Sequence, residues 1–150
     1  MISVNQAHVE LVHTAARIYN LDPALVCAVV EQESNWDTWA ARYEPAFYDR
    51  YIRPLIDRGE VKTATEGILR STSFGLMQVM GQTAREHGFL GRWLTQLCDP
   101  PIGIDMGCRV LKDKIKTDVW HGLQAYNGGG DPNYADEVLA RMPKYTEAGS

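Results

Sequence analysis

Residues 31–34, with the sequence EQES, place two carboxyl groups at the end of a strongly apolar segment. Apolar surroundings and the negative end of a helix dipole both favour the protonated form of a carboxyl group. A carboxylic acid that stays neutral near pH 7 can protonate a glycosidic oxygen. Two positions along a helix turn a side chain by about 200°, so Glu31 and Glu33 cannot both face one cleft. The pattern is also typical of a solvated helix end. A catalytic interpretation therefore requires further functional residues elsewhere in the chain.

Two later segments combine polar side chains with glycine. Residues 75–80, GLMQVM, contain one amide within an apolar run, and Gln78 could hydrogen-bond an N-acetyl group that lines a cleft. The apolar members of this run are equally typical of a core. In residues 125–129, AYNGG, the glycines let the backbone approach a ligand closely, although they also occur in ordinary turns.

The elements that must position these groups are mainly helical. Apolar residues at three- and four-residue spacings predict an amphipathic helix over residues 6–19. Asp22 as N-cap and Pro23 in the first turn predict a second helix over residues 23–34. This second helix is apolar nearly all round, which predicts that it is buried at the centre of the fold.

Further helices are expected downstream, separated by glycine and proline. Their predicted ranges are 77–87, 100–117, 120–126 and 133–142. The aromatic and charged segment 35–73 is expected to form a small hairpin or an irregular loop. Within it, Thr63 and Glu66 are spaced like a capping box that opens a short helix. Residues 85–87 are expected at an exposed helix end.

Composition narrows the classes of function. The chain has 150 residues and a net charge of −4 without a basic run, so one domain over residues 1–150 is expected and a nucleic-acid partner is not. No apolar run approaches the roughly 20 residues of a membrane span, and the first residues lack the pattern of a signal peptide. Four scattered histidines and three cysteines without a CxxC pair predict no metal site and no cofactor. Cys27 is expected in the core, and a Cys98–Cys108 bridge stays open.

In their order along the chain, the Glu-Ser, Gly-Leu-Met-Gln and Ala-Tyr-Asn-Gly-Gly motifs resemble the catalytic domain of soluble lytic transglycosylases. That family is related to goose-type lysozymes, and Phe74 before the second motif looks more like the goose-type pattern. The resemblance covers about residues 21–145, with further matches at residues 24–26, residues 82–84, Tyr134 and Val138. It implies a mainly α, lysozyme-like single domain, with helices around a buried central helix and a substrate cleft.

The resemblance also implies roles for single residues. Glu33 would be the acid, and Gln78 and Met80 would line the sugar sites. Tyr126 would help to position the catalytic carboxyl and the N-acetyl group, and Asn127 would shape the cleft. Ser34 would be structural.

One departure from the family concerns the segment between the first two motifs, which is longer than in the simplest members. Their serine in this segment has no secure counterpart here, and Ser71 and Ser73 are the candidates. Glu44 is a possible second carboxylate. Trp36, Trp39 and Tyr48 could face sugars or belong to the core.

Two chemistries follow from the resemblance. In a lyase, Glu33 alone cleaves the bond between N-acetylmuramic acid and N-acetylglucosamine and leaves a 1,6-anhydromuramoyl end. In an inverting hydrolase of the goose type, a second carboxylate about 6.5–9.5 Å away activates water. Its candidates are Glu44, Asp49, Asp57, Glu60 and Glu66. A third interpretation is a non-catalytic wall-binding or virion structural module that keeps the fold.

The expected partner is the glycan strand of peptidoglycan, and a monomer is expected to act on it at the bacterial cell wall, in the periplasm or outside the cell. A phage lysin made in the host cytoplasm and an excised catalytic domain are both compatible with the sequence.

Overall fold

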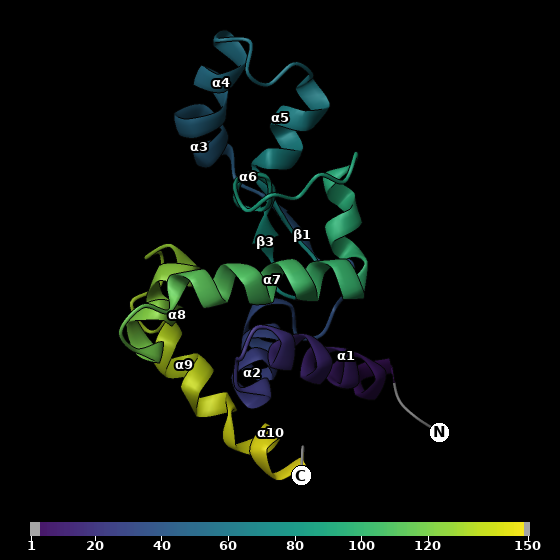
Figure 1. The fold of residues 1–150 in the computed structure, drawn as a ribbon. Helices are drawn as coiled ribbons and strands as arrows, with labels where there is room; N and C mark the ends of the chain where they lie inside the picture. Colours follow the sequence, from purple (N-terminus) through teal and green to yellow (C-terminus); the bar gives the residue numbers. More distant parts are fainter. Residues whose placement is uncertain (1–3, 149–150) are drawn as a thin grey trace.

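The computed structural model describes residues 4–148 and confirms a mainly helical, lysozyme-like chain (Figure 1). The longer helices are α1 (Val4–Ile18), α2 (Pro23–Ser34), α7 (Pro100–Lys114), α8 (Val119–Asn127) and α9 (Tyr134–Arg141). Helix α7 crosses the middle of the molecule, with α1 and α2 on one side of it (Figure 1). On that same side, α8, α9 and the short α10 (Pro143–Ala148) descend past α2.

Helix α2 is the buried centre that its composition predicts. The Asp22 carboxylate accepts a hydrogen bond from the backbone N–H of Ala24 at 2.9 Å, and Pro23 occupies the first turn. Every residue from Ala24 to Val30 is buried. The helix packs against α1, α9 and α10. Its end is set by Asn35, whose left-handed backbone terminates the helical hydrogen bonds just after the acidic residues.

The long segment between the first two motifs forms one strand and a group of short helices. After β1 (Ala41–Tyr43) come α3 (Pro45–Phe47), a π-helical turn η1 (Tyr48–Ile52), α4 (Arg53–Asp57) and α5 (Ala64–Arg70). Figure 1 shows α3, α4 and α5 together at the end of the molecule opposite α10. The prediction of a hairpin or irregular loop is therefore right only for β1. The hydroxyl of Thr63 caps α5 by accepting from the N–H of Glu66.

A three-stranded antiparallel sheet joins this group of helices to the rest of the fold. Its order is β1, β2 (Thr72–Phe74) and β3 (Val79–Met80), with Ser73 paired to Arg42 on one side and to Met80 on the other. The predicted helix over 77–87 is wrong at its start, because α6 comprises only Gly81–Glu86. Positive φ angles at Gly75 and Gln78 turn the chain back on itself and prevent a helix there.

The remaining sequence predictions concern the core and the cysteines. Helix α7 ends three residues earlier than predicted, and a 3₁₀ turn, η2 (Leu94–Cys98), precedes it. Trp36 is buried, whereas Trp39 is 79% exposed. All three cysteines are free, so a Cys98–Cys108 bridge is absent, and Cys27 lies in the core as predicted. No described helix has the length and apolar character needed to cross a membrane.

Candidate active site

The Glu33 carboxyl lies in the last turn of α2, partly shielded by α9. Its Oε1 accepts a hydrogen bond from the hydroxyl of Tyr134 at 2.7 Å, and Tyr134 itself is only 3% exposed. Burial raises the pKa of Glu33 to about 7, although the Tyr134 hydroxyl and the positive charge of Arg42 both act to lower it. A carboxyl group with this pKa can give up a proton and take it back near neutral pH.

Glu31 occupies the opposite face of α2 and has the opposite electrostatic surroundings. Its side chain is 11% exposed and forms ion pairs with Arg141 and Lys144. The hydroxyl of Tyr145 donates to its Oε1 at 2.7 Å, and the Trp36 indole donates to Tyr145. Burial alone would raise the pKa of Glu31, but hydrogen bonds from Lys144, Tyr145 and Arg141 outweigh it and lower the pKa to about 2. Glu31 is therefore ionised at neutral pH and fixes α10 against α2.

Replacing Glu31 by glutamine should destabilise the fold by about 2 kcal/mol at pH 7, because two half-exposed cations lose their shared partner. A depressed pKa contributes stability that is present above the usual carboxyl range and lost as pH falls toward 2. The difference in the free energy of unfolding between wild type and Glu31→Gln should therefore be largest above about pH 5 and shrink toward pH 2. Urea denaturation at several pH values measures it. A constant difference at every pH would contradict the ionised state of Glu31.

Two hydroxyl groups fix the turn of the second motif beneath Glu33. Ser34 donates to the carbonyl of Leu76 at 2.8 Å, which agrees with the structural role expected for this serine. Tyr126 donates to the carbonyl of Met77 at 2.6 Å. The hydroxyl that contacts Glu33 thus belongs to Tyr134, and the expected part of Tyr126 in positioning the carboxyl and the N-acetyl group stays a prediction. Tyr126 is close enough to Glu33 for that carboxylate to raise its own pKa further, after the larger effect of burial.

The side chain of Gln78 is used mainly by the protein itself. Its amide nitrogen donates to the carbonyls of Ala40 and Gly75, both at 2.9 Å, and its oxygen accepts from Ser73 at 3.1 Å. Both amide hydrogens are occupied, so an N-acetyl group could approach only its oxygen. Gln78 and Ser73 thus hold the sheet together at the second motif. Met80 is half-buried on β3, and its contact with a sugar stays a prediction.

Asn127 organises the glycine turn of the third motif. Its amide oxygen is placed to accept from the backbone N–H groups of Gly130 and Asp131, at 3.1 and 2.9 Å. Gly128 and Gly129 have φ angles of 81° and 85°, which explains why glycine is needed there. Asn127 therefore stabilises this turn, and its expected role in shaping the cleft stays a prediction.

The proposed second carboxylates are mostly held in ion pairs with arginine. Glu44 pairs with Arg42 at 2.8 Å, and its backbone N–H donates to Ser71. The other pairs join Asp49 to Arg53, Glu60 to Arg58 and Glu66 to Arg85. The charged side chain that acts on Glu33 is the cation of Arg42.

Three features of the site could not be predicted from sequence: the hydrogen bond from Tyr134 to Glu33, the position of Arg42 and the network around Glu31. Tyr134 matched the family pattern, but sequence alone assigned it no role. Its signal was a polar aromatic residue at the start of a predicted apolar helix face. Within the described part of the chain, no three His, Cys, Asp or Glu side chains gather to form a metal site.

Comparison with known proteins matches a profile described as the transglycosylase SLT domain to residues 10–141. The chain belongs to this family. Its curated relatives include the invasion protein IagB of Salmonella typhimurium, in strains SL1344 and LT2, and of Salmonella typhi. Each is 26% identical over 141 residues, which cover 91% of this chain and 72% of the relative. No solved structure matches the chain.

The family assignment confirms the resemblance drawn from the three motifs. Members of the SLT family are lytic transglycosylases that act on peptidoglycan in the cell wall. In this SLT domain, the three motifs come together around the end of α2: Ser34 contacts the second motif, and Tyr126 of the third motif contacts it from α8.

Proposed function

We propose that this SLT domain cleaves the β-1,4 bond between N-acetylmuramic acid and N-acetylglucosamine as a lytic transglycosylase, with Glu33 as its catalytic residue. The observation that supports this most directly is the pKa of about 7 for a half-buried carboxyl at the meeting point of the three motifs. A single group with this pKa can serve first as acid and then as base.

The reaction begins with Glu33 protonated. Its proton passes to the glycosidic oxygen as the bond from that oxygen to C1 of the muramoyl residue breaks, which releases the next sugar as an alcohol. The carbonyl oxygen of the substrate's own N-acetyl group supports the positive charge at C1. The Tyr134 hydroxyl stabilises the carboxylate that Glu33 has become, through the hydrogen bond at 2.7 Å.

In the second half, the Glu33 carboxylate accepts the proton of the C6 hydroxyl. The C6 oxygen then bonds to C1 and closes the 1,6-anhydro ring, which returns Glu33 to its protonated form. No water is consumed. Arg42, whose charge favours the carboxylate form of Glu33, assists the stage at which the carboxylate must persist.

The alternative is an inverting hydrolase, which needs a second carboxylate as a base. Ion pairing with arginine makes a carboxylate a weaker base. Four of the candidate carboxylates form such ion pairs: Glu44, Asp49, Glu60 and Glu66. This supports the lyase over the hydrolase. Glu44 is assigned to holding Arg42 rather than to activating water.

Product analysis tests the lyase directly. Purified peptidoglycan digested by the enzyme should yield muropeptides with anhydromuramoyl ends, one water lighter than hydrolytic products, in mass spectrometry. The same digestion with a known muramidase provides the hydrolytic reference. If reducing muramic acid ends predominate, the lyase proposal is wrong and the goose-type alternative replaces it.

Replacing Tyr134 by phenylalanine should lower turnover by about tenfold, because the carboxylate loses one charge-assisted hydrogen bond. Activity requires protonated Glu33 at the start, so it falls as pH rises through the pKa of Glu33. Since the Tyr134 hydroxyl lowers that pKa, its removal should shift the alkaline limb of the pH profile of kcat/KM to higher pH. A merely structural loss would reduce activity without moving the limb.

We place the activity at the bacterial cell wall, with a phage lysin as one setting. Turbidity loss of purified walls, compared with that of intact cells treated from outside, shows whether the enzyme reaches its substrate unaided.

A further inference from the structure

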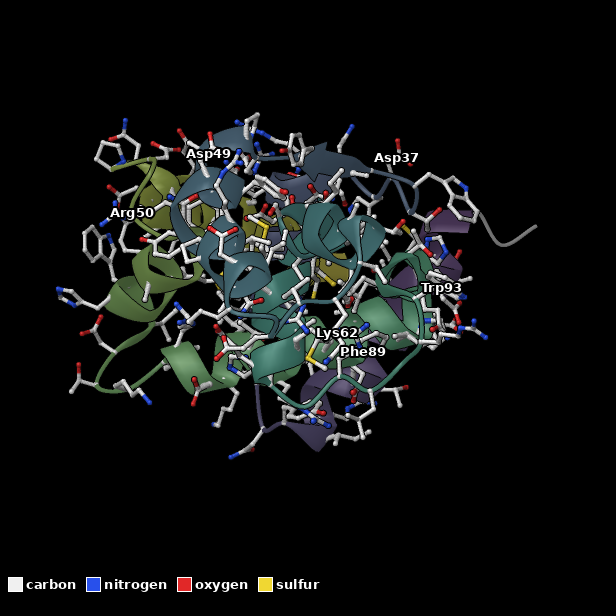
Figure 2. The ribbon with its side chains drawn as sticks, turned by 90° about the horizontal axis from the view of Figure 1, so that it is seen from above. Asp37, Asp49, Arg50, Lys62, Phe89 and Trp93 are labelled. Atoms are coloured by element: carbon white, nitrogen blue, oxygen red, sulfur yellow. The ribbon has the colours of Figure 1, made fainter. Side chains whose placement is uncertain are left out.

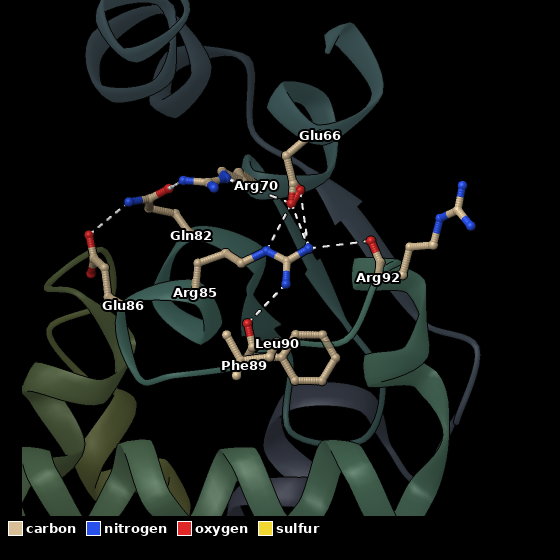
Figure 3. A pocket seen from close by; sticks show the side chains of 8 residues that line it. All are labelled: Glu66, Arg70, Gln82, Arg85, Glu86, Phe89, Leu90 and Arg92. Carbon is tan, nitrogen blue, oxygen red and sulfur yellow. Dashed lines mark hydrogen bonds and ion pairs between the residues drawn. The ribbon is translucent and has the colours of Figure 1, made fainter. Parts of the chain in front are cut away.

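A second polar surface lies away from Glu33, where α5, α6 and residues 89–94 meet. It contains two hollows of about 600 and 310 Å³, and both are lined by Glu66 and Arg92. Figure 3 shows the larger one. Seen from above, Phe89 and Trp93 lie on the side of the molecule away from Asp49 and Arg50 (Figure 2). Glu33 is not among the residues that line either hollow.

Arg85 forms the floor of the larger hollow and is fully occupied. It binds the Glu66 carboxylate with two nitrogens, at 2.8 and 3.2 Å, and donates to the carbonyls of Phe89 and Gly91 at 2.9 and 2.8 Å (Figure 3). The side chain is 17% exposed, so the prediction of an exposed helix end is wrong for this residue. Its role is to fix the shape of residues 89–92 against α5.

Two other arginines at this surface, Arg70 and Arg92, differ in how they are held. The buried Nε of Arg70 has no hydrogen-bond partner among the described residues, since the Glu66 carboxylate is 3.8 Å away. Arg92 forms no ion pair within the described part of the chain, and its guanidinium lies 5.1 Å from the ring centre of Trp93. The Arg70 Nε is buried, and the Arg92 guanidinium lies on the other side of the Glu66–Arg85 pair from Arg70 (Figure 3). Arg92 is therefore the cation at this surface that an anionic group can reach.

The smaller hollow offers different chemistry on the other side of Arg92. Thr63 and Thr65 supply hydroxyl groups, and Trp93 is 48% exposed. A partly exposed indole beside hydroxyl and guanidinium groups is able to stack on a sugar ring and hydrogen-bond its hydroxyls. The smaller hollow therefore presents a surface for a sugar next to the Arg92 cation, which can bind an anion.

We propose that these hollows form a second peptidoglycan-binding site, in which Trp93 contacts a sugar ring and Arg92 binds a carboxylate of the attached peptide. Peptidoglycan joins these two chemical groups in one polymer, whereas a plain glycan or a plain acidic peptide offers only one of them. This inference rests on the proposed function for its ligand class. A second contact with the same polymer raises the effective concentration of the wall near Glu33.

The test measures binding without cleavage. Purified sacculi are sedimented with the Glu33→Gln protein and with the same protein carrying Trp93→Ala or Arg92→Gln. Each added change should weaken binding by at least about fivefold. Trp93→Phe retains an aromatic face and should bind like the parent, and so should Arg58→Gln, a charge-matched change just after α4. Far-UV circular dichroism and thermal unfolding verify that the variants are folded.

Sacculi stripped of their peptides by an amidase separate the two halves of the site. The deficit of Arg92→Gln should disappear on stripped sacculi, while that of Trp93→Ala should persist. Equal binding of the parent, Trp93→Ala and Arg92→Gln to intact sacculi would overturn the inference, even if the enzyme yields anhydromuramoyl products. Loss of binding in an enzyme that yields no such products would instead retain this site and remove the proposed reaction.

Discussion

Glu33→Gln should reduce peptidoglycan cleavage by about a thousandfold while the protein remains folded. Glutamine preserves the shape of the side chain and can still accept the Tyr134 hydrogen bond, but it neither gives nor takes a proton in the reaction. Because the wild-type carboxyl is already partly neutral at pH 7, the change removes little charge from the site. Turbidity loss of a purified cell-wall suspension, together with a count of anhydromuramoyl ends, measures the effect.

Glu60→Gln is a suitable control, since Glu60 lies in an exposed ion pair with Arg58 and belongs to none of the three motifs. It should lyse walls at the wild-type rate. Equal lysis by the wild type and Glu33→Gln would remove Glu33 from the catalytic role. A wild-type protein that binds walls and releases no products would instead favour the non-catalytic wall-binding or virion module.

Gly75→Ala should destabilise the protein by about 3 kcal/mol or more, through two causes that coincide at one residue. Its φ of +75° is costly for any residue with a Cβ. A Cβ at this position would also lie 2.6 Å from the carbonyl oxygen of Leu97 and 3.2 Å from the Cα of Cys98. Both are backbone atoms, which can move only if the chain around them moves. Urea denaturation followed by circular dichroism gives the free energy of unfolding.

Gly59→Ala separates the two causes. Gly59 has a φ of +74°, and no other atom lies within 4 Å of the position that a Cβ would take, so alanine there should cost only about 1–2 kcal/mol. The difference between the two variants isolates the steric clash with Leu97. Equal losses would show that the backbone around η2 adapts, and that Gly75 is required for its φ angle alone.

The central helix could be predicted from sequence because its signals are local. Asp22 and Pro23 mark its start, its apolar residues mark its burial, and the charged residues at 31–33 mark its end. The order of the three motifs was sufficient to identify the family, because each motif is a short continuous segment of sequence. These predictions depend on neighbours within a few positions, which a sequence displays directly.

The features that sequence did not predict depend on long-range contacts or unusual backbone angles. Tyr134 reaches Glu33 across 101 positions, and no local pattern connects them. Gln78 adopts a φ of 49°, which is uncommon for a residue with a side chain, so a run of apolar residues that suggested a helix forms a turn and a strand. The same residue was expected to hydrogen-bond an N-acetyl group, which stays a prediction for its oxygen, because its nitrogen donates to the carbonyls of Ala40 and Gly75.

The separation between the two glutamates and their partners has a consequence for the order of folding. Tyr134 bonds to Glu33, and Arg141, Lys144 and Tyr145 bond to Glu31, each across more than a hundred positions. Contacts this distant along the chain close late, because the intervening loop must first lose its freedom. A nascent chain that already contains the first two motifs would still lack the Tyr134 hydroxyl that contacts Glu33. That hydrogen bond forms only when α9 docks, so the surroundings of the proposed acid are completed late in folding.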